Sequence, residues 1–416
     1  MNIEEVYKDL ISFLSSEYVK KVENRQPYIV IEVPSTKYLS LLFSIAKKYN
    51  LNIGVKKAFL HANDVLKPHG ELLVDLRQLN RIVNIDKENL TVTVESGVKF
   101  GTLSNVLNSN GLQLGIEPIF SEDVEMGEFI LQNGVGHGSL VNGSILNLIR
   151  DLEILFPDGS LIHTGFEDAS YYATGYNLTN LFVGSEGSLG IITKATLDVF
   201  VKPEKTNTIV FSSSDVETIF DIVKEVSKKA STVFSAFVID KAFIESIRTR
   251  IPEIHNEEFL GIVRLHGMKE IVEQEADSMK TLGNTIPQVG EKLWDLRFLS
   301  ILKETLGEIV LYEYLVPTNK CCEVYYALKN FSSKCKVKPS LYILQIDLKT
   351  NLVVFAFRVE DLNKIDHSSL QKDIASLGGT LYSGNLLATT NKRLFSKLKK
   401  MFDPSNLLGP KAEDGM

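Results

Sequence analysis

Cysteine is scarce in this 416-residue chain, which has only Cys321, Cys322 and Cys335. An odd number of cysteines without the paired spacing of metal ligands argues against a disulfide framework and against a zinc site. We therefore expect three free thiols in a reducing compartment.

A long apolar run is also missing. Residues 38–46 (YLSLLFSIA) contain polar interruptions and are followed by Lys47 and Lys48, whereas a bilayer span needs about 20 mostly apolar residues. The N-terminus, MNIEEVYKDL, begins with acids and lacks the basic start of a signal peptide. We predict no membrane span and a cytoplasmic location.

The chain has no excess of positive charge. It carries 45 Lys and Arg against 52 Asp and Glu, a formal net charge of −7. A mildly acidic protein has no overall attraction for phosphate backbones. Nucleic acid is therefore not expected as a partner.

The elements that are present favour two mixed domains, because a chain of this length exceeds the usual size of one core. In the first half, residues 90–95 (LTVTVE) alternate apolar and polar side chains, which predicts a half-buried strand. Residues 112–180 are rich in Gly and Asn, and we expect irregular structure there apart from a strand at 151–156. The other elements expected in this half are helices at 1–24, 36–49 and 99–109 and strands at 28–33, 72–76, 81–85, 160–164 and 191–201.

The second half alternates regularly between strands and helices, which predicts an α+β domain around an antiparallel sheet. The expected strands are 208–212, 233–239 and 258–267, and the expected helices are 215–229, 240–248 and 269–281. A last helix at 392–402 should end before Asp403-Pro404, since the residue before a proline avoids helical geometry.

The sharpest local motif is FVGSEGSLGIIT at residues 182–193. Its glycines, Gly184, Gly187 and Gly190, let backbone amides approach a ligand closely and accept positive φ. Consecutive exposed amides form a concavity that suits anions. By itself, such a run is equally compatible with a glycine-rich turn before a strand.

Several further blocks occur with this motif in a fixed order, namely VDLRQLNRIV from residue 74, LEILFPDGSLIHTG at 152–165 and DPSNLLGPK at 403–411. In this order they resemble the FAD-linked oxidase and dehydrogenase family, which has the vanillyl-alcohol-oxidase or PCMH-type fold. Within that family, the chain is similar to dehydrogenases of D-lactate, glycolate and D-2-hydroxyglutarate.

The resemblance implies an α+β fold, with FAD as the cofactor. It implies an N-terminal helix at 1–26, a PCMH-type FAD-binding domain of two α+β subdomains at 27–205, an antiparallel-sheet cap domain at 206–390, and a tail at 391–416 that returns to the FAD domain. The cofactor-binding positions carried over are Gly127, Asn133, Gly134, Gly136, Gly138, Ser139, Gly143, Ser144, Gly184, Ser185, Glu186, Gly187, Gly190 and Ile192.

The sequence departs from the family in both loops that face the FAD phosphates. The first loop falls at residues 57–61 (KAFLH) and has lost its glycines. The second reads Glu125-Met126-Gly127-Glu128, and its two carboxylates would repel a diphosphate unless they point away.

The family's metal-binding histidines are missing too. An alignment without gaps puts them at Ile346 and Val353, and the later Glu-His at Asn385-Leu386. Apolar side chains neither bind zinc nor accept a proton, so we expect no metal site.

Three residues are candidates for catalysis. Arg297 ends a Trp-x-x-Arg pattern whose arginine holds a substrate carboxylate in the family, although a structural ion pair is an equal alternative. His137, between glycines, would contact or covalently hold the flavin, or would be an exposed loop histidine. Tyr312, with Glu313 and Tyr314, lies on a strand that carries a substrate-binding lysine in relatives, or is a structural residue.

The function implied is an FAD-dependent dehydrogenase. It would oxidise a small organic substrate, such as lactate or glycolate, by hydride transfer to the flavin and pass electrons to an acceptor that the sequence does not identify. The alternative is a non-catalytic or assembly subunit of a flavin dehydrogenase complex with weakened FAD binding. A homodimer and a subunit of a larger complex both stay open.

Overall fold

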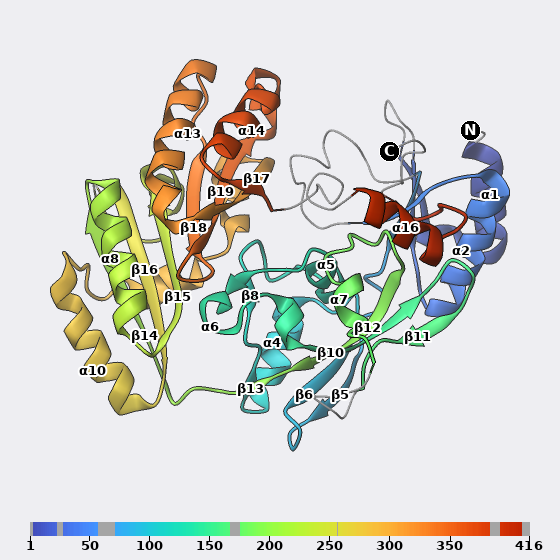
Figure 1. The fold of residues 1–416 in the computed structure, drawn as a ribbon, viewed down its shortest axis with the longest axis horizontal. Helices are drawn as coiled ribbons and strands as arrows, with labels where there is room; N and C mark the ends of the chain where they lie inside the picture. Colours follow the sequence, from blue (N-terminus) through green and yellow to red (C-terminus); the bar gives the residue numbers. More distant parts are fainter. Residues whose placement is uncertain are drawn as a thin grey trace.

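The computed structural model describes residues 3–22, 28–56, 71–166, 175–255, 257–382 and 392–409. The elements up to residue 201 and the last helix form one half of the molecule, and a large sheet with its helices forms the other (Figure 1). Within the described ranges, no helix combines the length and the apolar character that crossing a membrane requires.

The N-terminal sheet has four strands in the order β1-β2-β4-β3. β2 (Tyr28–Glu32) and β3 (Ile53–Val55) both run parallel to β4 (Leu72–Asp75), and α2 (Thr36–Tyr49) connects β2 to β3. The helix expected over residues 1–24 is shorter than predicted. α1 (Ile3–Phe13) stops early, and β1 (Val19–Val22) pairs with β2 because its β-branched valines suit a sheet edge better than a helix.

A second sheet of five antiparallel strands follows, in the order β11-β10-β12-β6-β5. Its strands are β5 (Ile82–Asp86), β6 (Thr91–Glu95), β10 (Ile149–Leu155), β11 (Leu161–His163) and β12 (Ile191–Asp198). The expected half-burial of β6 is wrong, because all five of its residues are buried. Its polar side chains find partners inside, as Thr93 does with Thr196 at 2.9 Å between their hydroxyl oxygens.

Residues 100–182 contain more regular structure than the sequence predicts. Beside α4 (Phe100–Ser109), they form the short helices α5 (Met126–Leu131), α6 (Ser139–Asn142) and α7 (Thr179–Phe182). They also form the two-residue ribbon of β8 (Glu117–Pro118) and β9 (Gly136–His137), and β7 (Leu112–Gln113), which pairs with β13 (Phe200–Val201). These elements were missed because each is too short to show a period.

The third sheet has seven antiparallel strands in the order β14-β16-β15-β18-β19-β17-β20. The strands are β14 (Lys205–Ser213), β15 (Val233–Asp240), β16 (Phe259–Gly267), β17 (Ile309–Pro317), β18 (Ser340–Gln345), β19 (Thr350–Arg358) and β20 (Thr380–Leu381). The strands and helices expected between residues 208 and 281 are confirmed to within a few residues at each end.

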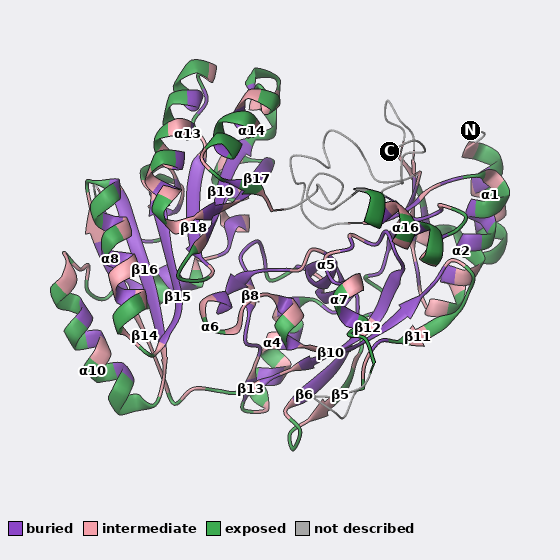
Figure 2. Cartoon of the chain, viewed as in Figure 1, coloured by how far each residue is buried: buried purple, intermediate pink, exposed green. Residues whose placement is uncertain are grey.

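The two faces of the seven-stranded sheet belong to different cores. One face, here called the outer face, is covered by α8 (Val216–Lys229), α10 (Lys269–Met279), α13 (Cys321–Cys335) and α14 (His367–Ser376). The other, the inner face, shares a continuous apolar cluster with residues 92–156 and with α9 (Lys241–Ile247), α11 (Gly290–Asp295) and α12 (Leu302–Leu306). Both faces are therefore buried, and the exposed surface of this half lies on the outer sides of its helices (Figure 2).

The chain ends beside the N-terminal sheet. α16 (Lys392–Phe402) precedes Asp403-Pro404 as predicted, and the backbone of Leu408 forms a parallel bridge with Ile53 of β3. The buried ammonium of Lys399 donates to the backbone oxygen of Ser188 at 2.6 Å and pairs with Asp403 at 2.7 Å. The tail therefore holds the turn before β12 in place.

Candidate active site

The structure brings the two glycine-rich segments together. Gly127 lies in α5, and residues 133–144 continue from it through β9 and α6. The turn at 184–187 packs back on α5, where the amides of Gly184 and Glu186 donate to the backbone oxygens of Ile130 and Leu131 at 3.3 and 3.1 Å. The predicted cofactor residues of these two segments are therefore neighbours in space.

The motif predicts backbone amides that are open to a ligand. In the structure, several amides of the glycine-rich turn are not open. Those of Gly184, Ser185 and Glu186 are used in hydrogen bonds within the protein. Gly184 and Gly187 instead provide positive φ values of 76° and 79°, where a side chain would be strained. Their Cα atoms face the side chains of Asn133 and Val55, which an added Cβ would meet at 3.3 and 3.2 Å.

A small pocket opens where this turn meets the end of β3. Lys56 and Glu186 contribute charged side chains to its lining, which also includes Gln132 of the segment after α5. The complete set of lining residues is Val55, Lys56, Glu128, Leu131, Gln132 and Glu186. The loop expected at residues 57–61 begins just after Lys56 and lies outside the described residues.

Charge is unevenly balanced beside this pocket. The ammonium of Lys56 and the guanidinium of Arg77 both pair with Asp75, the former at 2.7 Å, and hold the pKa of that carboxyl down against its burial. Burial, and after it the nearby carboxylates of Asp75 and Glu128, raise the pKa of Glu125 to about 7. Among the described residues, Lys56 and Arg77 are thus the cations that lie near these carboxyl groups at the start of α5.

His137 lies in a closed aromatic cage between the two halves of the molecule. It is fully buried, and its ring nitrogens contact the hydroxyls of Ser235 at 2.8 Å and Tyr342 at 3.1 Å. The rings of Phe237 and Trp294 lie about 5 Å from its own, with centroid distances of 5.1 and 4.9 Å. Burial, and secondly the charge of Arg297, hold its pKa well below the usual value, so the ring is neutral.

Arg297 completes the same cluster through an ion pair. One of its terminal nitrogens lies 2.8 Å from a carboxylate oxygen of Glu117, and its other terminal nitrogen donates to the backbone oxygen of Trp294 at 2.9 Å. Its guanidinium also stacks on the rings of Trp294 and Phe298. Glu117 and His137 face each other on the β8–β9 ribbon, so one ribbon carries both groups that contact the seven-stranded sheet and α11.

The structure does not bring Tyr312 together with these two residues. Tyr312 belongs to the core of the outer face, where its hydroxyl hydrogen-bonds to His367 of α14. Alternation along β17 turns its neighbour Glu313 the other way, toward the inner face. Of the three catalytic candidates, only His137 and Arg297 share a site.

Glu313 and Tyr382 mark the point where the inner face meets the glycine-rich segment. The hydroxyl of Tyr382 accepts from the amide of Val135 at 2.8 Å and donates to the backbone oxygen of Asn133 at 3.1 Å. The pKa of Tyr382 is raised, first by burial and then by the charge of Glu313. Because Tyr382 contacts Asn133 and Val135, the carboxylate of Glu313 lies close to the loop at 133–138. Sequence reasoning missed Tyr382, because this residue follows a two-residue strand that no pattern predicts.

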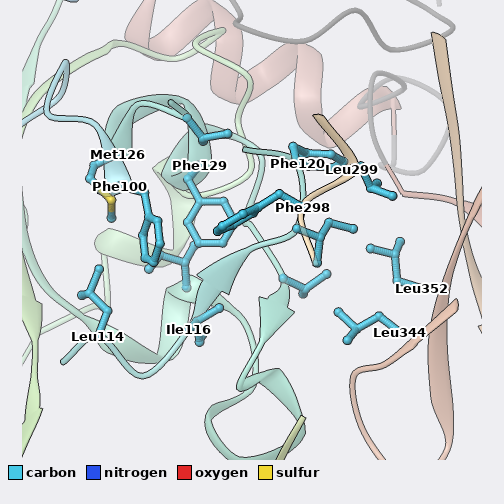
Figure 3. Packing of buried hydrophobic residues seen from close by; sticks show 14 of the residues in the cluster. Phe100, Leu114, Ile116, Phe120, Met126, Phe129, Phe298, Leu299, Leu344 and Leu352 are labelled. Atoms are coloured by element: carbon cyan, nitrogen blue, oxygen red, sulfur yellow. The ribbon is translucent and has the colours of Figure 1, made fainter. Parts of the chain in front are cut away.

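Apolar side chains fill most of the contact between the two halves. Phe120 and Phe129 approach Phe298 and Leu299, and Leu344 and Leu352 extend the cluster from β18 and β19 (Figure 3). The alignment without gaps had placed a family histidine at Val353, but Val353 lies in the outer-face core and Leu352 takes the inner position. Among the residues that the structure describes, no group of three or more His, Cys, Asp or Glu is arranged to bind a metal ion.

Comparisons with known proteins agree with this arrangement. Residues 27–165 match the family described as FAD binding domain. The chain is 30% identical to a probable mitochondrial D-lactate dehydrogenase of Danio rerio over 53% of its own length, a match that spans only 45% of that protein. It is 23% identical to the glycolate oxidase subunit GlcD of Bacillus subtilis over 92% of this chain and 88% of that one.

The fold is shared with a solved flavoprotein structure. p-Cresol methylhydroxylase superposes with a TM-score of 0.79, covering 98% of this chain and 96% of that one at 15% sequence identity. The order of sheets and this superposition lead to one conclusion: the chain has the fold of p-cresol methylhydroxylase, and its residues 27–165 match the family described as FAD binding domain.

Proposed function

We propose that this protein is an FAD-dependent dehydrogenase that oxidises a small 2-hydroxy acid, with D-lactate and glycolate as the first candidates. FAD supplies the hydride acceptor when it is bound. The observation that carries the proposal is the junction of Glu313 and Tyr382 with the glycine-rich segment at 133–138, because it puts a buried carboxylate beside the loop that faces the flavin ring in this fold.

The described residues offer part of a site for an FAD dinucleotide, since the pocket at the turn has a volume of about 10 Å³. The turn at 184–187 and the end of β3 form the sides of a pocket in which Lys56 provides a cation and Gln132 an amide. Gly184 and Gly187 keep Cβ atoms away from it. The crowded carboxyls at α5 suit a diphosphate only while Glu125 is neutral, and the raised pKa of about 7 favours that form below neutral pH.

In this proposal Glu313 takes the hydroxyl proton of the substrate. It is 1% exposed and lies on the inner face, so few water molecules compete for the proton. Tyr382 positions the loop through its contacts to Asn133 and Val135. Arg297 has a smaller part than the sequence suggested, since a substrate carboxylate would bind there only by displacing Glu117.

The neutral, caged His137 is a positioning residue in this proposal. Both of its ring nitrogens already have hydroxyl partners, so a covalent bond to the flavin would require the cage to open. The substrate contact and the chemistry would then rest on the inner face of the sheet near Glu313.

The test is anaerobic reduction of the purified, FAD-loaded protein by D-lactate, glycolate and D-2-hydroxyglutarate, followed in the flavin absorbance bands. We expect at least one acid to bleach the flavin. If dithionite bleaches it and none of the acids does, the substrate assignment is wrong. A colourless protein that takes up no FAD at saturating concentration would instead favour the non-catalytic subunit.

A further inference from the structure

A second cavity lies on the outer face of the seven-stranded sheet, between α8 and α13. It has a volume of about 220 Å³, somewhat below the roughly 300–1,000 Å³ of sites for drug-sized ligands. Its apolar walls come from α8 and the sheet, chiefly Phe220, Val223, Val238 and Ile343. The cavity suits a small molecule with an apolar body.

One wall of this cavity carries a buried hydrogen-bond donor without an acceptor. Gln345, at the end of β18, is 3% exposed. The hydroxyl of Ser227 lies 2.6 Å from the amide oxygen of Gln345 and 2.9 Å from the backbone oxygen of Val223. We assign its proton to the shorter contact, so the amide oxygen of Gln345 accepts from Ser227. Its amide nitrogen has no partner among the described residues. Buried donors are almost always paired in native proteins, so this one points to an acceptor that the described residues do not supply.

The other polar groups of the cavity limit what that acceptor can be. The amide nitrogen of Asn351 is already satisfied by the hydroxyl of Thr318 at 2.9 Å. Lys224 lies half-buried at the rim and forms no ion pair with a described residue. Asp221, one turn earlier on α8, also lines the cavity but is exposed, and Asp215, Glu217 and Glu323 act with it on Cys322. A cation that stays at the rim, together with a donor inside, favours an oxygen anion.

We propose that this cavity is a binding site for a small organic carboxylate, whose oxygen accepts from Gln345 and whose charge is balanced by Lys224. The site does not depend on the proposed function. Val238 and Ile343 in its wall point to the outer-face core, while Glu313 lies on the opposite face of the same sheet. A ligand here would therefore act on the molecule without contacting the substrate.

Cys322 provides a direct measure of occupancy. It lines the cavity and is half-buried, while Cys335, at the other end of α13, is half-buried outside the lining. Burial, with added effect from nearby acids, raises the pKa of Cys322 to about 11, so alkylation by iodoacetamide needs alkaline pH. The two thiols can be followed separately in one protein by mass spectrometry of its peptides.

The probes are butyrate, butyramide and butylamine, which have bodies of similar size and different polar ends. At about ten times its dissociation constant, butyrate should slow alkylation of Cys322 about tenfold and leave Cys335 unchanged. Butyramide should bind more weakly, because it keeps the acceptor and lacks the charge. Butylamine, kept protonated by running the assay below a pH of about 9, has no acceptor for Gln345 and should not protect.

Two variants test the assigned roles. Gln345→Leu should weaken butyrate binding about tenfold or more, since it removes the donor with little change in size. Lys224→Met should weaken butyrate and leave butyramide unchanged, while Lys228→Met, one turn along α8, should affect neither. The proposal is overturned if butylamine protects as well as butyrate, if none of the probes protects, or if Gln345→Leu retains full protection. Lys224→Met, at the rim, keeps the test valid should Gln345→Leu fail to fold.

Discussion

Two groups of charged and polar residues in this molecule differ in how completely they are paired. At the β8–β9 ribbon, Arg297 has Glu117 and a backbone oxygen, and both nitrogens of His137 have hydroxyl partners. At the start of α5, Asp75, Glu125 and Glu128 share Lys56 and Arg77. In the first group, Arg297 and His137 have their partners within the protein. The second group contains a carboxyl, that of Glu125, with a strongly raised pKa.

This difference suggests where a ligand acts. Groups whose interactions are all made inside the protein contribute to stability and have nothing left for a ligand. Groups held in an unfavourable environment are typical of functional sites, because the ligand or the reaction relieves the strain. We therefore propose that Glu117, His137 and Arg297 join the two halves, and that the start of α5 and the remaining glycine-rich residues serve the cofactor and substrate.

The largest effect should come from Glu313, on the functional side of this comparison. Glu313→Gln should slow flavin reduction by the substrate acid about 10²–10⁴-fold, because a positioned proton acceptor contributes on that scale. FAD content should stay the same. Stopped-flow absorbance measures the rate, and Glu308→Gln, just before β17 and exposed, is the matched control. An unchanged rate in Glu313→Gln would remove Glu313 from the reaction.

The next effect concerns the structural side. Glu117→Gln and Arg297→Met should each lower the free energy of unfolding by roughly 2–3 kcal/mol, since each leaves a largely buried group without its partner. Urea denaturation measures this loss. Arg250→Met breaks the exposed pair with Glu304 and should cost less than about 1 kcal/mol. If Glu117→Gln instead tightens substrate binding without loss of stability, Arg297 holds the substrate after all.

The sequence predicted the framework better than the site. Strands such as β15 and β16 and helices such as α8 have clear periods, and Asp403-Pro404 marks the end of α16, so their positions followed from local patterns. The short elements between residues 112 and 182 depend on contacts with distant chain segments. One example is Gly136, where an added Cβ would lie 1.9 Å from the backbone oxygen of Glu117.

The site residues show the same limit. The Trp294–Arg297 pattern and His137 could be picked out as special, but their partners could not. Ser235 and Tyr342 meet His137 across separations of 98 and 205 residues. Likewise, only the alternation of β17 in the folded sheet decides that Glu313, and not Tyr312, faces the loop at 133–138.

A smaller effect should come from His137 itself. His137→Phe leaves the hydroxyls of Ser235 and Tyr342 without their partner, and should cost about 1–3 kcal/mol of unfolding free energy. The pKa of His137 is lower in the folded protein than in the unfolded chain. As pH falls below about 6.5, the unfolded chain therefore takes up the proton before the folded protein does, and the wild type should lose stability. The variant should lose less on acidification, although His266, whose folded pKa is lowered to about 4, retains part of that dependence.

Acid precipitation separates this structural role from a flavin link. It should release all FAD from the wild type, and a pellet that is yellow in the wild type but colourless in His137→Phe would mean that His137 leaves its cage to bind the flavin. His255→Phe, at an exposed histidine, is the control and should change neither stability nor flavin content.

The smallest effect should come from Glu125, where the charge is least balanced. The pKa of about 7 makes its carboxyl neutral below neutral pH and charged above it, near Asp75 and Glu128, with Lys56 and Arg77 as the nearby cations among the described residues. The affinity for FAD should therefore fall as pH rises through about 7. Glu125→Gln should remove this fall and bind FAD about tenfold more tightly at alkaline pH, since one like charge near a diphosphate costs about 1–2 kcal/mol.

The same substitution should also stabilise the apoprotein at alkaline pH. The pKa of Glu125 is higher in the folded protein than in the unfolded chain. Its contribution to the free energy of unfolding is therefore complete below the unfolded pKa, and it is lost as pH rises through about 7. Fluorescence titration with FAD across this pH range tests the ligand effect, and urea denaturation without FAD tests the stability effect. If the affinity for FAD does not depend on pH in the wild type, the phosphates do not lie at α5. A stability gain without any change in FAD affinity would mean that the strain of Glu125 is purely structural.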